Sequence, residues 1–175
     1  MNKVMKVMLL VTLVSLGIAA LWNSVPIIKN SIHYILDPTA GSLLNFNANL
    51  GLLIITAIVS LAIALVQKYT VDADEMKKIK EEQKILKEEM AKFKAHPEKM
   101  LELQKRQMAM IPKTWDLTMK PLIYTSLPII LFFRWFNDYF ITNPVKFFGI
   151  MSWIWAYLIL SIIFSIIFMK LLKLP

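Results

Sequence analysis

Nine polar side chains lie within or beside long apolar stretches of the chain, and their spacing is regular. The first set recurs at intervals of seven, four and seven residues, which places its members within about 40° of one another on a helix. The second set recurs every four residues, and the third is an arginine four residues before an aspartate. The three sets are Asn49, Thr56, Ser60 and Gln67; Tyr157, Ser161 and Ser165; and Arg134 with Asp138.

Side chains of these types can hydrate a polar segment inside a bilayer without any covalent chemistry. Three polar faces turned toward each other would line a wet groove, which lowers the high free-energy cost of a polar group in hydrocarbon. Alternatively, each hydroxyl bonds back to its own helix or joins two helices, for about 0.6 kcal/mol. Arg134 lies about 21 Å along a span that begins at Lys120, so it either pairs with Asp138 or attracts an anionic substrate group.

Other kinds of site have little support in the sequence. The chain has no cysteine, four glycines and two histidines far apart, and it contains no P-loop, dinucleotide-binding or HExxH motif. We therefore expect no metal site, no cofactor, no catalytic residue and no enzymatic activity, and we interpret His33 as an interfacial polar residue. The net charge of +8 is compatible with anionic partners such as lipid headgroups or RNA. Much of it lies at the ends of apolar stretches, where positive-inside topology alone would place it, so we expect membrane lipid and not DNA as a partner.

The elements that carry these residues are apolar and long. With 57% hydrophobic and 18% charged residues, the chain is predicted to be an all-α integral membrane protein, since about 20 apolar residues cross a bilayer core. The N-terminal segment is either a cleaved leader or an extra span, and we favour a retained helix. The predicted segments are an N-terminal hydrophobic segment at 1–22, an outer interfacial segment at 23–48 that includes a turn at 37–41, and core transmembrane helices at 49–68, 121–141 and 147–171.

A soluble arm at 69–120 separates the first two core helices. Residues 72–120 hold 22 of the 32 charged residues, while apolar residues recur every seven positions at Ile79, Leu86, Phe93 and Met100. This pattern predicts an antiparallel coiled-coil hairpin that stands off the membrane, with a second helix that starts at Pro97 and ends before Pro112. The lysines beside the spans place the arm and the C-terminus in the cytoplasm.

Six of the eleven methionines lie in this arm. Methionine is flexible and recurs on surfaces that accept varied apolar partners, so the arm is a candidate client-contact surface. The alternative is that these side chains fill the coiled-coil seam or rest on lipid headgroups. The six residues are Met76, Met90, Met100, Met108, Met110 and Met119.

Several short motifs occur in a characteristic order around the predicted coiled coil. They are Asp37-Pro38 with Gly41, Lys68-Tyr69-Thr70 with Asp72, Pro97-Glu98-Lys99 with Leu103-Gln104, and Lys120-Pro121 with Leu127-Pro128-Ile129-Ile130. In this order the chain resembles the archaeal YidC-like membrane proteins of the YidC/Oxa/Alb insertase superfamily, to which the insertase subunit of the ER membrane protein complex is related. The resemblance covers the chain from Asp37 to its C-terminus.

The resemblance implies a multi-pass plasma-membrane insertase for nascent membrane proteins. It implies a three-helix core with a cytoplasm-facing hydrophilic groove and a mobile coiled coil that meets the client or the ribosome. Two features depart from the family: the first core helix has no arginine, so Arg134 is not its equivalent, and the tail at 170–175 is too short for a ribosome-binding extension. The alternative functions are a small channel or transport subunit, and a membrane-anchored coiled-coil tether or assembly protein.

Overall fold

The computed structural model describes residues 3–94 and 96–174, and the described chain is helical apart from short connections and one bridge between Phe147 and Met151. Three of its helices are long and apolar enough to cross a membrane, which confirms the predicted all-α membrane fold. The elements are α1 (Lys3–Ala20), α2 (Pro26–Leu36), the π-helical turn η1 (Asp37–Gly41), α3 (Ser42–Phe46), α4 (Ala48–Thr70), α5 (Ala73–Lys92), α6 (Pro97–Thr142) and α7 (Trp153–Leu171).

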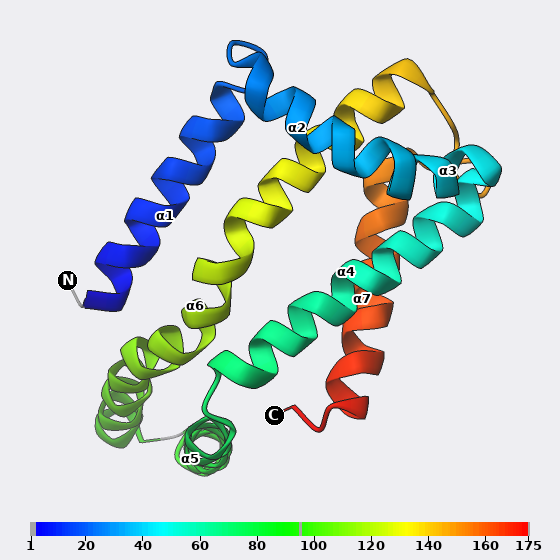
Figure 1. Ribbon diagram of the computed structural model, residues 1–175. Helices are drawn as coiled ribbons and strands as arrows, with labels where there is room; N and C mark the ends of the chain where they lie inside the picture. Colours follow the sequence, from blue (N-terminus) through cyan, green and yellow to red (C-terminus); the bar gives the residue numbers. More distant parts are fainter. Residues whose placement is uncertain (1–2, 95, 175) are drawn as a thin grey trace.

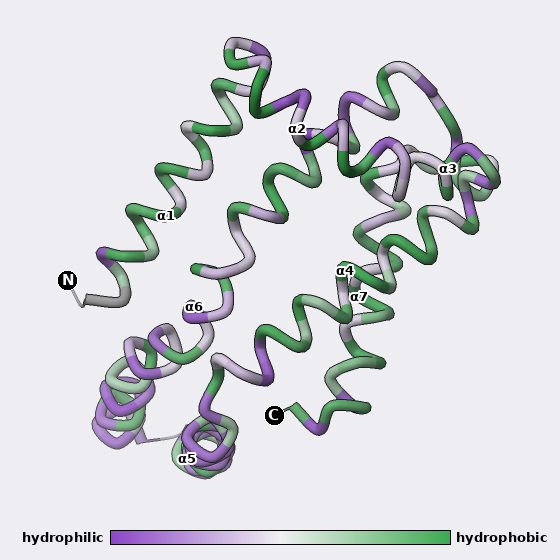
Figure 2. The backbone as a smooth tube through the Cα atoms, in the orientation of Figure 1, coloured by the Kyte–Doolittle hydropathy of each residue, from purple (hydrophilic) through white to green (hydrophobic). Residues whose placement is uncertain are grey.

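The candidate spans α4, α6 and α7 form an open bundle with α1 against its side (Figure 1). Helix α1 runs alongside α6 in the same direction, while α4 packs mainly on α7. At one end, here called the loop end, α2, η1, α3 and the α6–α7 connection lie together. The other end, here called the arm end, carries α5 and the first part of α6, where the hydrophilic residues gather (Figure 2).

Helix α6 is continuous over 46 residues and contains Pro112, Pro121 and Pro128. The predicted end before Pro112 is therefore wrong, and the second arm helix and the second span form a single helix. A proline removes one backbone hydrogen bond and clashes with the preceding turn, which bends a helix but ends it only if nothing else holds the turns together. Here Met110, Leu117 and Pro121 are buried against neighbouring helices across this region, and the helix bends toward the bundle instead (Figure 1).

The predicted turn at 37–41 is also wrong, because the chain continues there as the π-helical turn η1. Pro38 is the second residue of this turn, and the helical run of α2 continues through it without a break. The Asp37 carboxylate accepts a hydrogen bond of 2.7 Å from the Trp135 indole N–H. This contact with α6 holds the backbone in a helical conformation that the local sequence disfavours.

The arm is the predicted pair of helices, with α5 begun by Asp72, whose carboxylate accepts hydrogen bonds from the N–H groups of Asp74 and Glu75. Its packed seam joins Met76 and Ile79 of α5 to residues of α6 that are also buried. Figure 1 shows α5 end-on while the spans are seen from the side, so the arm lies crosswise to the bundle. The expectation that the arm stands off the membrane stays a prediction.

A dense aromatic core closes the loop end. Trp22, Trp135, Phe136 and Phe147 are at most 1% exposed, and the rings of Phe136 and Phe140 each stack on Trp153 with centroids 5.6 Å apart. Because aromatic rings bury large areas and interlock edge to face or in stacks, this end of the bundle is held more firmly than the open arm end.

Candidate groove in the membrane-spanning bundle

A hollow of about 320 Å³ lies between α4 and α7 and is lined by hydroxyl groups. Ser60 comes from α4, and Tyr157, Ser161 and Ser165 come from α7, with three isoleucines completing the wall. Ser60 and Tyr157 are each 5% exposed, while the Ser161 hydroxyl donates to the Leu158 carbonyl at 2.9 Å. We call this space the polar hollow.

The depth of the polar hollow follows from helix geometry. Ser165 lies six residues from the arm end of α7 and Tyr157 fourteen residues from it. At 1.5 Å per residue these positions are about 9 Å and about 21 Å from that end. Ser60 lies ten residues from the end of α4, which is about 15 Å. The hydroxyl lining thus runs from about a third to about three quarters of the length of α7, counted from its arm end.

A second hollow of about 310 Å³ lies on the other side of α4, against α6. Its wall is almost wholly apolar and includes Val59, Val66, Pro128 and Phe132. Ile63 lines both hollows. The polar hollow and the apolar hollow therefore lie at the same level along α4, and this helix separates them. A smaller space of about 130 Å³ follows at the arm end, where Gln67, Met76 and Met169 meet.

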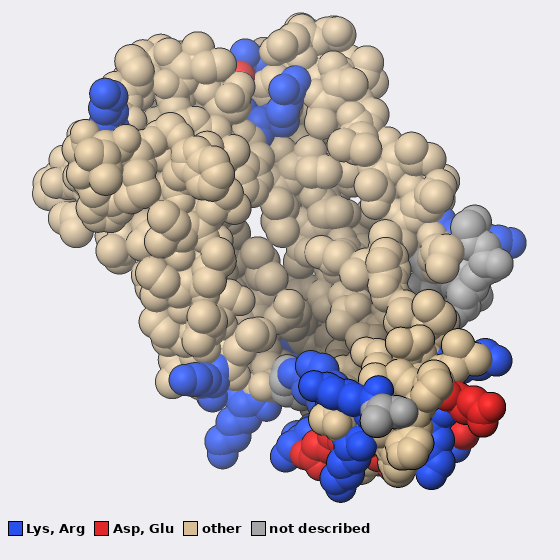
Figure 3. All heavy atoms as spheres, turned by 180° about the vertical axis from the view of Figure 1, so that it is seen from behind, with Lys and Arg blue, Asp and Glu red and all other residues tan. Residues whose placement is uncertain are grey.

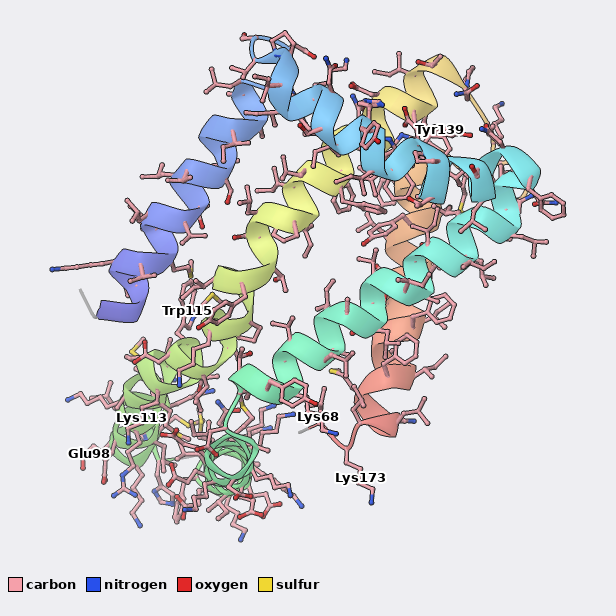
Figure 4. The ribbon with its side chains drawn as sticks, in the orientation of Figure 1. Lys68, Glu98, Lys113, Trp115, Tyr139 and Lys173 are labelled. Carbon is pink, nitrogen blue, oxygen red and sulfur yellow. The ribbon has the colours of Figure 1, made fainter. Side chains whose placement is uncertain are left out.

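A polar cluster at the loop end is organised by Asp138 of α6. Its carboxylate accepts hydrogen bonds from the Trp22 indole N–H at 2.8 Å and from the Lys29 ammonium at 2.8 Å. His33 lies 3.4 Å from the same oxygen and 3.1 Å from the Asp37 carboxylate. We call these contacts the loop-end latch, because they fasten the α1–α2 connection, α2 and η1 to α6 beside Tyr139 (Figure 4).

The structure brings together four of the nine predicted groove residues, namely Ser60, Tyr157, Ser161 and Ser165. Thr56 is fully buried, and its hydroxyl donates to the Leu52 carbonyl of its own helix at 2.6 Å. Asn49 lies at the loop end, where its side-chain oxygen accepts a hydrogen bond from the Phe148 N–H. Gln67 lines the small space at the arm end.

Arg134 and Asp138 do not form an ion pair, which was one of the two alternatives predicted for Arg134. The ion pairs found for Asp138 among the described residues are with Lys29 and His33. Arg134 is half-buried, and its buried Nε has no hydrogen-bond partner there. The four-residue spacing permits a pair on one helix, but the ammonium and imidazole of α2 lie closer to the carboxylate.

The six arm methionines do not share one surface. Met76 and Met110 are buried in the seam between α5 and α6, while Met108 is 69% exposed. Met90, Met100 and Met119 are half-buried. The seam thus accounts for two of the six, and Met108 points away from it.

Sequence reasoning missed the loop-end latch. Lys29, His33 and Asp37 follow one another at intervals of four residues, which places a cation, an imidazole and a carboxylate on one face of a helix. That spacing could have predicted a charged face on the helix that holds Lys29 and His33. In the described ranges, no group of three histidine, aspartate or glutamate side chains could hold a metal ion.

Residues 33–175 match the family model described as integral membrane protein EMC3/TMCO1-like. The chain belongs to this family. The EMC3/TMCO1-like family is part of the insertase-related YidC/Oxa1/Alb3 group, which agrees with the superfamily expected from the sequence motifs. The matched residues include all of α4 to α7 and both hollows, while α1 lies before them. Neither the curated proteins nor the solved structures gave a significant match.

Proposed function

We propose that this EMC3/TMCO1-like protein is a plasma-membrane insertase of the archaeal YidC-like kind, with the arm end and the C-terminus in the cytoplasm. Its clients are nascent membrane proteins whose apolar helices carry short polar flanks. The observation that carries this proposal is the polar hollow, because four hydroxyl-bearing side chains face a recess between two spanning helices at membrane depth. Membership of an insertase-related family supports the same function.

The two hollows suit the two parts of such a client. A polar flank entering from the arm end exchanges water for the hydroxyls of Ser165, Ser161 and Tyr157 up to about 21 Å into a core of about 30 Å. The fully apolar remainder of the path is then about 9 Å, which lowers the desolvation barrier for a polar group. The client's apolar helix lies against the apolar hollow on the other side of α4.

The closed loop end favours an insertase over a channel. A channel needs a continuous wet path, whereas here the aromatic core and the loop-end latch occupy the far end of the bundle. A half-path is sufficient for an insertase, because the client crosses the remainder only once and then stays in the bilayer.

The test is insertion of a short-tailed client into vesicles that contain the purified protein. The triple variant Ser60→Leu, Ser161→Leu and Ser165→Leu removes three hydroxyls, each worth about 0.6 kcal/mol, so insertion should slow about 20-fold. The matched control replaces isoleucines of the same helices outside the polar hollow, as Ile54→Leu, Ile159→Leu and Ile163→Leu. Equal insertion by both variants, with unchanged helix content, would refute the proposal.

A further inference from the structure

The arm part of α6 has two opposite apolar faces, and only one of them is packed. Leu103, Met110 and Leu117 recur every seven residues and are 3–8% exposed. Met110 and Leu117 pack on Met76 and Ile79 of α5. On the opposite side lie Leu101, Met108, Ile111 and Trp115, which are 56%, 69%, 51% and 47% exposed. At 100° per residue these four fall within about 80° of one another, and we call them the arm stripe.

The arm stripe is continuous with the membrane-facing surface of the same helix. Helix α6 runs unbroken from the arm into the span, where Leu122 is 45% exposed at the next heptad position after Trp115. From Leu101 to Trp115 the stripe measures about 21 Å along the helix. An exposed apolar face of this length in an otherwise charged arm indicates a surface that is covered in use.

The direction of the arm decides which surface can cover the stripe. The arm lies crosswise to the spans (Figure 1), and therefore along the plane of the membrane surface. Trp115 lies above Lys113 and Glu98, toward the bundle, at the end where Lys68 and Lys173 mark the ends of α4 and α7 (Figure 4). Tryptophan beside lysines is typical of the bilayer interface.

The charges around the stripe fit a lipid surface too. No charged residue lies within the sector that the stripe covers; the nearest, Lys105, is about 40° beyond its edge, and the acidic residues Glu98 and Asp116 are about 60° beyond it. The arm's charged side chains gather at this end of the molecule, while the spans above are nearly bare of charge (Figure 3). An uncharged apolar helix face with a lysine at its border suits the headgroup region of a bilayer.

We propose that the arm stripe rests on the bilayer surface on the arm's side, with Met108, Ile111 and Trp115 among the lipid headgroups. In this arrangement the arm part of α6 contacts lipid with one face and α5 with the opposite face. The small space beside Met76 and Gln67 then lies between the arm and the ends of the spans.

The chain has no cysteine, so a single introduced thiol carries a unique label. Met108→Cys places a polarity-sensitive fluorophore on the stripe, and Ala109→Cys places it one residue along, about 100° around the helix and also exposed. Both full-length variants are reconstituted into vesicles of phosphatidylcholine and phosphatidylglycerol, with or without nitroxide-labelled lipid.

The proposal predicts blue-shifted emission at position 108 and quenching by the nitroxide lipid at least threefold stronger than at position 109. Adding Ile111→Asp and Trp115→Asp should bring position 108 to the value at 109. Equal, weak quenching at both positions would overturn the proposal. Blue-shifted emission without lipid quenching would also overturn it, because a protein surface such as a second copy or a client would then cover the stripe.

Discussion

Replacing Asp138 by asparagine tests how strongly the loop-end latch holds the bundle together. The substitution keeps the size of the side chain and an acceptor for the Trp22 indole, but it removes the charge that faces the Lys29 ammonium at 2.8 Å. A charge-assisted hydrogen bond contributes about 1.5–3 kcal/mol. The Lys29 side chain is 37% exposed and that of Asp138 is 20% exposed, so screening places the expected loss near the lower end, at about 2 kcal/mol.

The assay is thermal unfolding of the detergent-solubilised protein, where about 2 kcal/mol corresponds to a fall in Tm of about 6 °C. A double-mutant cycle with Lys29→Met should give a coupling energy of at least about 1 kcal/mol. Glu102→Gln is the matched control, because the Arg106–Glu102 pair has the same 2.8 Å distance with both side chains over 60% exposed. Its expected effect is below about 1 kcal/mol. Equal Tm shifts for the two variants, or additive effects in the cycle, would refute the account of the latch.

Three further changes probe the packing of other elements. Gly51→Ala places a Cβ 2.6 Å from the Leu43 carbonyl oxygen, so α3 must move away from α4. The free energy of unfolding should therefore fall by about 2 kcal/mol, and an unchanged Tm would contradict this. Met110→Ala empties a buried position of the seam and should lower the free energy of unfolding by about 2 kcal/mol, whereas Met108→Ala on the exposed face should lower it by less than about 0.5 kcal/mol. The resistance of the arm to protease compares the two variants. Equal loss of protection in both would contradict the packed seam. Asp72→Ala removes the N-terminal cap of α5 and should lower the stability of the arm by about 1 kcal/mol in the same assay. Unchanged protease protection would show that the cap adds no stability.

The spans and half of the groove could be predicted because their signals are local. An apolar run long enough to cross a bilayer has few other uses, which fixes α4 and α7. Ser161 and Ser165 recur every four residues on one helix face, and Ser60 faces them across the interface between α4 and α7. Spacing on single helices was not enough by itself, because it also selected Asn49, Thr56 and Gln67, which do not line the polar hollow.

The partners of Asp138 could not be predicted, because they depend on tertiary packing. Arg134 is four residues away in sequence, but Lys29, more than one hundred residues away, reaches the carboxylate. The arm shows a second kind of ambiguity, since Leu103 and Leu101 each begin an apolar face with helical spacing. Periodicity reveals that both faces exist, whereas only the position of α5 decides which one is buried.

Photocrosslinking from inside the polar hollow tests the central claim most directly. A photoreactive amino acid replaces Ser161, which lines the hollow, or Ile159, which is exposed about 160° away on α7. During insertion of a client with a short polar tail, the proposed function predicts that position 161 crosslinks to the tail and position 159 to lipid. Crosslinks to the tail from position 159 alone, or from neither position while insertion proceeds, would contradict the proposed path.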